Sequence, residues 1–153
     1  MRKQLSFILL ILSISTFSFT QQQDKSDSQS DIKHIIQGEF RYQYGQGWQF
    51  SWNLNSTPHR IFGGKISQHF NASDPIESEY AAREFISANQ FIYNLSENNL
   101  DLWVNEQHGN LRYLIFNQAF QGIPVYNARV DFRYRKNGEL VMIGHDAYPN
   151  ISL

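Results

Sequence analysis

The sequence contains no cysteine, which excludes several classes of protein at once. A disulfide framework, a thiolate metal site and a cysteine nucleophile all need a residue that this chain lacks. Stability must therefore come from packing. The 153 residues suffice for one domain around one hydrophobic core.

A charge excess of either sign is also missing. Thirteen Lys and Arg side chains stand against 14 Asp and Glu side chains, which gives a formal net charge of -1. Such a balance creates no broad positive field that would attract phosphate backbones. We therefore expect no nucleic-acid partner.

Motifs that assemble a catalytic site are absent as well. The sequence has no zinc-binding His-Glu-x-x-His helix, no Gly-x-Ser-x-Gly elbow and no phosphate-cradling glycine loop. Glu77 and Glu79 would point to different faces of a helix, so they do not form a catalytic pair. The histidines are scattered over predicted turns and strand ends, where we expect them to be solvated or hydrogen-bonded: His34, His59, His69, His108 and His145. The chain is predicted to be non-catalytic, with no metal ligand and no cofactor.

The first 20 residues have the pattern of a secretory signal peptide. Arg2 and Lys3 form a basic start, an apolar run from Leu5 to Ile14 follows, and Ser18 and Thr20 supply small residues near a cleavage point. A membrane anchor would need about 20 apolar residues, and serines dilute this run. We expect a secreted protein without a stable membrane anchor. The polar residues 21–32 are predicted to be a disordered leader.

Residues 33–70 are predicted to form an aromatic-rich segment of strands and loops. From Phe40 to Trp52 the aromatic side chains are spaced mostly by two around Gly45 and Gly47, which indicates two short strands and a glycine turn. Residues 53–64 have the composition of a loop, and Pro58 argues against a central strand.

The clearest helix signal lies at the start of residues 71–150. Asp74 can cap the helix, Pro75 fits its first position, and Glu77 can reach back to the amide of the capping residue. The sequence predicts a helix from Pro75 to about Asn89. Its apolar stripe comprises Ala81, Phe85, Ala88 and Ile92.

Four stretches rich in β-branched and aromatic residues follow: Leu100–Val104, Leu111–Phe120, Val125–Tyr134 and Glu139–Ala147. Their short links contain glycine, and the Asn137-Gly138 pair suits a type I′ turn. The fold class is therefore α+β, with a helix packed on an antiparallel meander and short aromatic-rich strands upstream. Both faces of the second strand are partly apolar. One is expected under the helix, and the other against the upstream aromatic strands or a partner.

The segment between Asn110 and Val130 carries a motif. A strand ends in a glutamine, an aromatic residue follows, and Gly-Ile-Pro-Val and a second aromatic residue open the next strand. Through this motif the chain resembles the fungalysin/thermolysin propeptide (FTP) family, and the resemblance covers about residues 75–150. The matching residues are Gln118, Phe120, Gly122, Ile123, Pro124, Val125, Tyr126, Gly138 and Gly144.

The resemblance implies a pro-domain that inhibits a secreted zinc metallopeptidase or assists its folding, in cis or in trans. None of the motif residues is catalytic in that family, and zinc would belong only to the peptidase domain. On this interpretation residues 151–153 are a truncated tail, and the chain is either a precursor fragment or a free-standing inhibitor. The alternative is a secreted binding or adhesion module that exposes Trp48, Trp52 and Trp103 as an aromatic surface.

Overall fold

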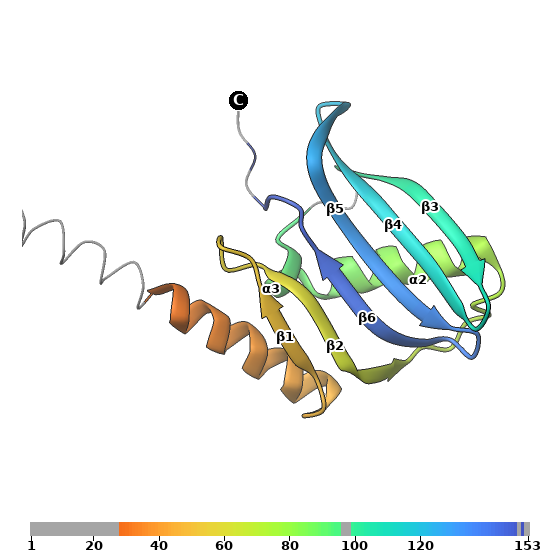
Figure 1. Cartoon of the computed structure of the whole chain (residues 1–153), viewed down its shortest axis with the longest axis horizontal. Helices are drawn as coiled ribbons and strands as arrows, with labels where there is room; N and C mark the ends of the chain where they lie inside the picture. Colours follow the sequence, from red (N-terminus) through yellow and green to blue (C-terminus); the bar gives the residue numbers. More distant parts are fainter. Residues whose placement is uncertain (1–27, 96–98, 150, 152–153) are drawn as a thin grey trace, which may run out of the picture.

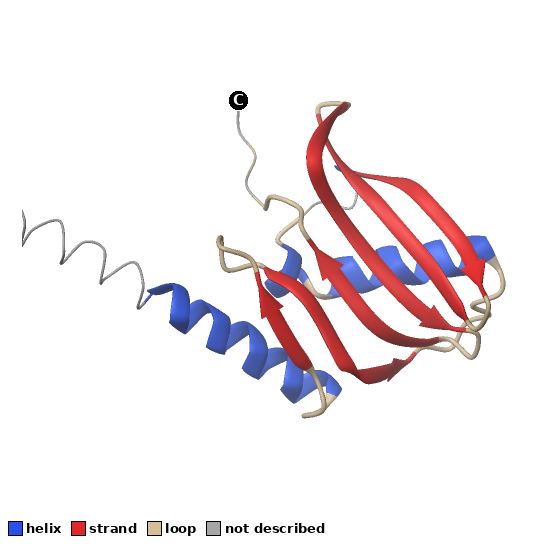
Figure 2. Ribbon diagram, viewed as in Figure 1, coloured by secondary structure: helices blue, strands red, loops and turns tan. Residues whose placement is uncertain are grey.

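The computed structural model describes residues 28–95, 99–149 and 151. A six-stranded antiparallel sheet forms one layer, and the helices pack on one of its faces (Figures 1 and 2). The sheet order is β1-β2-β6-β5-β4-β3. The α+β class is thereby confirmed, including the helix on an antiparallel meander. The predicted signal peptide, residues 21–27 of the leader and residues 152–153 lie outside the described residues.

The elements follow the chain in a simple order. A helix at 28–44, called here the N-terminal helix, precedes all the others. Their bounds are β1 Gln49–Trp52, β2 Pro58–Ser67, α2 Pro75–Ala88, α3 Gln90–Tyr93, β3 Leu100–His108, β4 Leu111–Phe120, β5 Ile123–Arg135 and β6 Glu139–His145.

The N-terminal helix replaces two predicted features, the last part of the disordered leader and the first aromatic strand. Phe40 is fully buried, and its ring lies 4.8 Å from that of Tyr44, whereas Tyr42 is 85% exposed. A strand would have placed all three on one face. The deciding period is four residues, since Ile36, Phe40 and Tyr44 all contact the core. Gly45 ends the helix with a φ of 97°.

Strand β2 lies where a loop was predicted. Pro58 is its first residue and pairs with Trp52 beside a bulge, so the missing N–H of proline is tolerated there. Farther along β2, Gly64 lies against the Trp48 ring, and a side chain at this position would collide with it. Because β2 pairs with β6, the predicted division between residues 33–70 and 71–150 cuts through one continuous sheet.

Helix α2 has the predicted start and ends one residue before the predicted end. The Asp74 carboxylate accepts hydrogen bonds from the N–H groups of Ile76 (2.7 Å) and Glu77 (3.2 Å). The Glu77 carboxylate, however, accepts from the N–H of Asn71 at 2.8 Å and not from that of Asp74. The Asp74 N–H is already donated to the Asn71 carbonyl, which explains the difference.

The buried face of α2 contains the first two residues of the predicted apolar stripe but not the last two. Ala81 and Phe85 are buried, but Ala88 is exposed and Ile92 belongs to α3. The stripe fails there because α2 ends at Ala88 and the chain changes direction at Asn89, which has a φ of -118°. The buried face consists of Ser78, Ala81, Ala82, Phe85 and Ile86.

Strand β4 matches its predicted bounds, and β5 and β6 lie within two residues of theirs, whereas β3 continues four residues beyond its predicted end at Val104. The predicted type I′ turn at Asn137-Gly138 is wrong, because only Gly138 of the pair has a positive φ. The Gly138 N–H donates to the Arg135 carbonyl at 2.9 Å. The type I′ conformation occurs instead between β4 and β5, where Gln121 and Gly122 have φ values of 51° and 79°.

The two faces of the sheet differ as the alternation of β4 predicts. Leu114 and Phe116 are fully buried under the helices, whereas Tyr113 and Ile115 on the other face are only partly covered. The expectation that upstream strands would cover this second face is wrong, since β1 and β2 extend the sheet sideways beyond β6. No described helix or strand covers it, and it is called here the open face.

Candidate functional site

Several residues of the FTP-like motif serve the architecture of the domain. The Gln118 amide donates to the Tyr148 carbonyl (2.8 Å) and accepts from the Tyr148 N–H (2.9 Å), which fixes the chain after β6. Gly138 has a φ of 79°, and a Cβ there would lie 2.6 Å from the Gln68 carbonyl oxygen. Gly144 leaves room for the Asp131 carboxylate, which a Cβ would strike.

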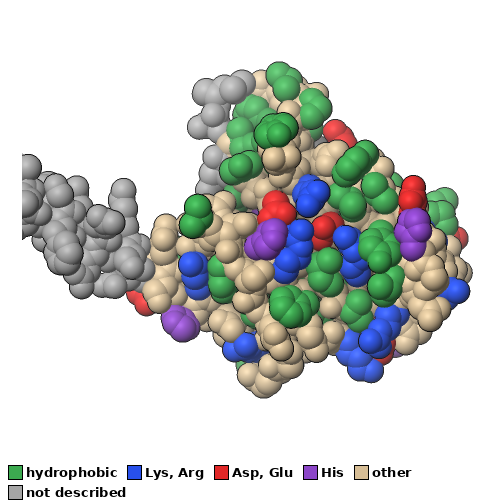
Figure 3. Space-filling view, viewed as in Figure 1, with side chains coloured by type: hydrophobic (Ala, Val, Ile, Leu, Met, Phe, Trp, Pro, Cys, Tyr) green, Lys and Arg blue, Asp and Glu red, His purple; other side chains and the backbone are tan. Residues whose placement is uncertain are grey.

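The remaining motif residues form the hairpin between β4 and β5. Gly122 shapes its turn, and Phe120 and Val125 are partly buried. Ile123 is 64% exposed, Tyr126 is 86% exposed, and Pro124 is exposed as well. Figure 3 shows hydrophobic side chains gathered at this end of the molecule. Ile123, Pro124 and Tyr126, called here the hairpin tip, contribute little to the core.

Charged side chains occupy the centre of the open face (Figure 3). Arg60 comes from β2, residues 129–133 come from β5, and Asp146 follows β6, so the sheet joins groups about 70–85 positions apart in sequence. This arginine–aspartate cluster comprises Arg60, Arg129, Arg133, Asp131 and Asp146. Three arginines against two aspartates leave the cluster with one excess positive charge.

Asp131 lies at the middle of the cluster. Its side chain is only 4% exposed, and its Oδ2 pairs with Arg60 at 3.8 Å and with Arg133 at 3.7 Å. Both distances exceed hydrogen-bond length, and Oδ1 is buried without a hydrogen-bond partner among the described residues. The Arg133 guanidinium also lies 4.3 Å from the centre of the Tyr113 ring. The Asp131 carboxylate is therefore flanked by two guanidinium groups, but its Oδ1 accepts no hydrogen bond from a described residue.

Asp146 is better satisfied than Asp131. Its Oδ1 lies 2.6 Å from His59 Nδ1, and its Oδ2 accepts from Arg60 at 3.1 Å. Burial would raise the pKa of Asp146, but hydrogen bonds from His59, Arg60 and Asn53 outweigh it and lower that pKa. Asp146 is thus held as a carboxylate at the rim of the open face.

The histidines do not converge on one centre. His59 lies at the cluster, whereas His145 is fully buried on the core side of β6, with its ring 5.2 Å from that of Tyr93. Neither ring nitrogen of His145 has a hydrogen-bond partner among the described residues, so the expectation of solvated or hydrogen-bonded histidines is wrong for this residue. Within 28–95, 99–149 and 151, no group of three or more His, Asp or Glu side chains could hold a metal ion.

The three tryptophans do not share a surface. Trp48 is buried, Trp52 is half-buried and stacked on Phe50, and Trp103 is 62% exposed. Trp52 and Trp103 lie on β1 and β3, the two opposite edges of the sheet. An aromatic surface that combines all three is therefore excluded. In the described part of the chain, no helix is long and apolar enough to cross a bilayer.

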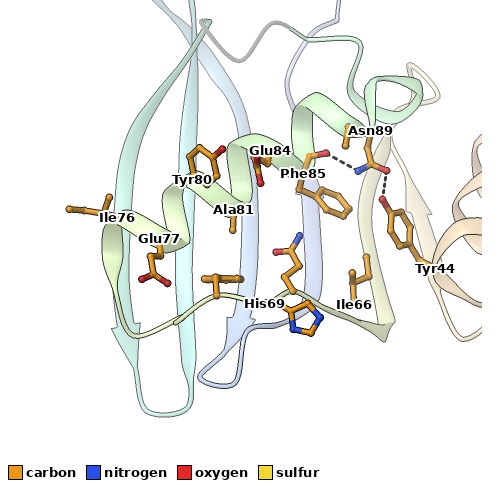
Figure 4. A pocket seen from close by; sticks show the side chains of 13 residues that line it. Tyr44, Ile66, His69, Ile76, Glu77, Tyr80, Ala81, Glu84, Phe85 and Asn89 are labelled. Carbon is orange, nitrogen blue, oxygen red and sulfur yellow. Dashed lines mark hydrogen bonds between the residues drawn. The ribbon is translucent and has the colours of Figure 1, made fainter.

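A second surface feature is a groove between α2 and the segment that follows β2 (Figure 4). Its volume is about 600 Å³. The residue patterns of the sequence do not predict this groove. The exposed side chains of Ile76 and Tyr80, four residues apart on α2, were the available signal. Its lining consists of Tyr44, Ile66, Gln68, His69, Phe70, Ile76, Glu77, Tyr80, Ala81, Glu84, Phe85, Ala88 and Asn89.

Together these features define a two-layer α+β domain with an open, charged sheet face and a protruding apolar hairpin. Comparisons of the chain with protein-family models, curated proteins and solved structures gave no match.

Proposed function

We propose that the chain is a non-catalytic propeptide-like domain that binds a secreted zinc metallopeptidase and inhibits it or assists its folding. The observation that carries this proposal is the exposure of the hairpin tip. Gln118, Gly122, Gly138 and Gly144 account for the architectural part of the motif, but the apolar side chains of the tip are left in solvent. Exposed apolar residues next to one another favour a contact with another protein.

The open face supports the same proposal. A sheet face without a covering layer offers a flat area for a partner, and the arginine–aspartate cluster supplies charges that can select its orientation. Phe62 and Met142, on β2 and β6, are partly exposed on this face beside the cluster. The proposed interface thus combines an apolar tip with a charged centre. The peptidase would supply its own zinc, and the contact can form in cis or in trans.

The test is a refolding and inhibition assay with thermolysin as the peptidase. The purified chain is added to active thermolysin and, separately, to denatured thermolysin during dilution into buffer. We expect slower peptide cleavage, a higher refolding yield, or both. The double variant Ile123→Ser/Tyr126→Ser should weaken the effect at least about tenfold, as loss of central interface contacts does. A control variant, Leu54→Ser, changes a side chain that is 98% exposed in the β1–β2 link and should act like the wild type.

Two outcomes would count against the proposal. No effect on thermolysin, or on a fungalysin-type enzyme used in the same way, would remove its basis. An effect that both variants retain would show that the hairpin tip is not the contact.

The alternative, a secreted binding module, is favoured by one local observation. Beside Trp103, a depression of about 220 Å³ is lined partly by Pro124, Val125 and Arg129. A ligand that fits there should shift and protect the Trp103 fluorescence, whereas Trp48 is already buried and should not respond. A Trp103→Phe variant would separate the two signals.

A further inference from the structure

The groove beside α2 has largely apolar walls. Ile66 lies on the β2 side, Ala81 and Phe85 lie on the helix side, and Tyr44 lies at one end (Figure 4). Phe70, in the segment that follows β2, also lines the groove. The Tyr44 hydroxyl donates to the Asn89 side chain at 2.9 Å, which ties the N-terminal helix to the end of α2. A volume of about 600 Å³ lies within the range of sites for small organic ligands.

The polar lining of the groove includes two carboxylates, those of Glu77 and Glu84, beside the imidazole of His69. Glu84 makes no hydrogen bond or ion pair with another described residue, and Gln68 Oε1 is buried without a hydrogen-bond partner. Glu77 adds a second carboxylate at the helix start. None of the lining residues is a lysine or an arginine. The groove therefore combines an apolar floor with negative charge and at least one acceptor that lacks a donor.

We propose that this groove binds a small primary amine with an apolar body. The ammonium group would face the Glu84 carboxylate. The body would lie against the rings of Phe70 and Phe85. An anionic ligand would be repelled by the Glu84 carboxylate. A neutral ligand would leave the Glu84 charge unused.

The backbone around the groove argues against an extended peptide as the occupant. Strand β2 is paired with β6 on one side, and β1 covers its other side from Pro58 to Phe62. Beyond β2, the N–H of Gln68 donates to Gly138 and that of Phe70 donates to Gln68. A peptide lying here would bring main-chain groups that these donors could not serve. A compact ligand with one charged group fits better.

The experiment measures binding of three probes that share one body and differ in charge. Phenethylamine, phenethyl alcohol and hydrocinnamate are titrated into the purified, isotope-labelled chain, and amide shifts of α2 are followed by NMR. We expect the amine to bind at least about tenfold more tightly than the alcohol, because a charge-assisted hydrogen bond is added. The acid should not bind.

Two matched variants locate the charge effect. Glu84→Gln should lower the affinity for the amine about tenfold and leave that for the alcohol unchanged. Glu106→Gln removes the same charge from β3, at the far edge of the sheet, and should change neither affinity. Ala88→Trp places a large ring in the groove from an exposed position and should abolish binding of both.

The proposal is overturned by any of three results. One is equal affinity for amine, alcohol and acid, and another is no shift on α2 with any probe up to about 10 mM. The third is amine binding that survives Ala88→Trp. None of these results bears on the peptidase assay, because the hairpin tip is formed by β4 and β5 and contributes no residue to this groove.

Discussion

Protonation of His145 should make the stability of the domain depend on pH between pH 6.5 and about pH 4, mostly above the ordinary pKa values of carboxylates. Burial lowers the pKa of His145 from 6.5 to about 4, and the nearby Asp146 charge opposes this only in part. Below pH 6.5 the His145 side chain becomes protonated in the unfolded chain, whereas in the folded chain it becomes protonated only near pH 4. The contribution of neutral His145 is therefore complete above pH 6.5 and is lost as the pH falls through this window.

The magnitude follows from the two pKa values. Between pH 7.5 and pH 4.5, the linkage relation gives a loss of about 2.5 kcal/mol in the free energy of unfolding from this one side chain. Carboxylates whose pKa is lowered in the folded protein affect stability at lower pH values than His145 does. Hydrogen bonds from Lys65, Asn137 and Arg135 lower the pKa of Glu139 to about 2, so its stabilising effect is lost only as the pH falls below the ordinary pKa of 4.5. The interval above pH 4.5 is thus largely that of His145.

The assay is urea unfolding at a series of pH values, followed by the fluorescence of buried Trp48. The wild type should lose about 2.5 kcal/mol from pH 7.5 to pH 4.5, whereas His145→Leu should stay nearly flat over the same interval. His34→Gln, which changes an exposed histidine of the N-terminal helix, should follow the wild type. Parallel curves for the wild type and His145→Leu would refute the reasoning.

Three further predictions concern single side chains. Gly144→Ala should destabilise the domain by about 2 kcal/mol, measured by urea unfolding, because the new methyl group displaces Asp131 from the cluster. The double variant Asp131→Gly/Gly144→Ala removes the side chain that the methyl group strikes and should relieve this clash. Gln118→Leu should lower the free energy of unfolding by about 2 kcal/mol and speed hydrogen exchange at the Tyr148 amide. Unchanged exchange would show that the Gln118 side chain does not hold the Tyr148 backbone. Asp74→Ala should lower stability by about 1 kcal/mol through loss of the α2 cap, measured by thermal unfolding, with Asp74→Asn retaining most of it.

Local chemistry made parts of the fold predictable from the sequence. Asp74 and Pro75 determine where α2 begins, and glycines at tight links separate strands whose lengths follow from β-branched and aromatic runs. The N-terminal helix was missed because Phe40, Tyr42 and Tyr44 satisfy a period of two, while the burial of Phe40 and Tyr44 follows a period of four. Strand β2 was missed because Pro58 and two glycines weaken a strand pattern that pairing with β6 overrides.

The candidate sites were less predictable than the fold. Arg60 and Asp146 meet only because β2 lies beside β6, a pairing that no local pattern encodes. The groove depends in the same way on how α2 crosses the sheet next to the end of β2. The division of the motif residues into architectural and exposed members required their solvent exposure, which the sequence does not give.

Buried polar atoms without a hydrogen-bond partner among the described residues occur on both sides of the sheet. The hydroxyls of Tyr93 and Tyr134 and both nitrogens of His145 lack partners among the described residues, and these side chains all belong to the core beneath the helices. Asp131 Oδ1 is different, because Asp131 belongs to the open face. A buried acceptor without a donor costs about 1–3 kcal/mol. Because Asp131 Oδ1 is closed to solvent and lies over Gly144, a partner docked on the open face would contact the Arg60 and Arg133 guanidinium groups, and not this oxygen.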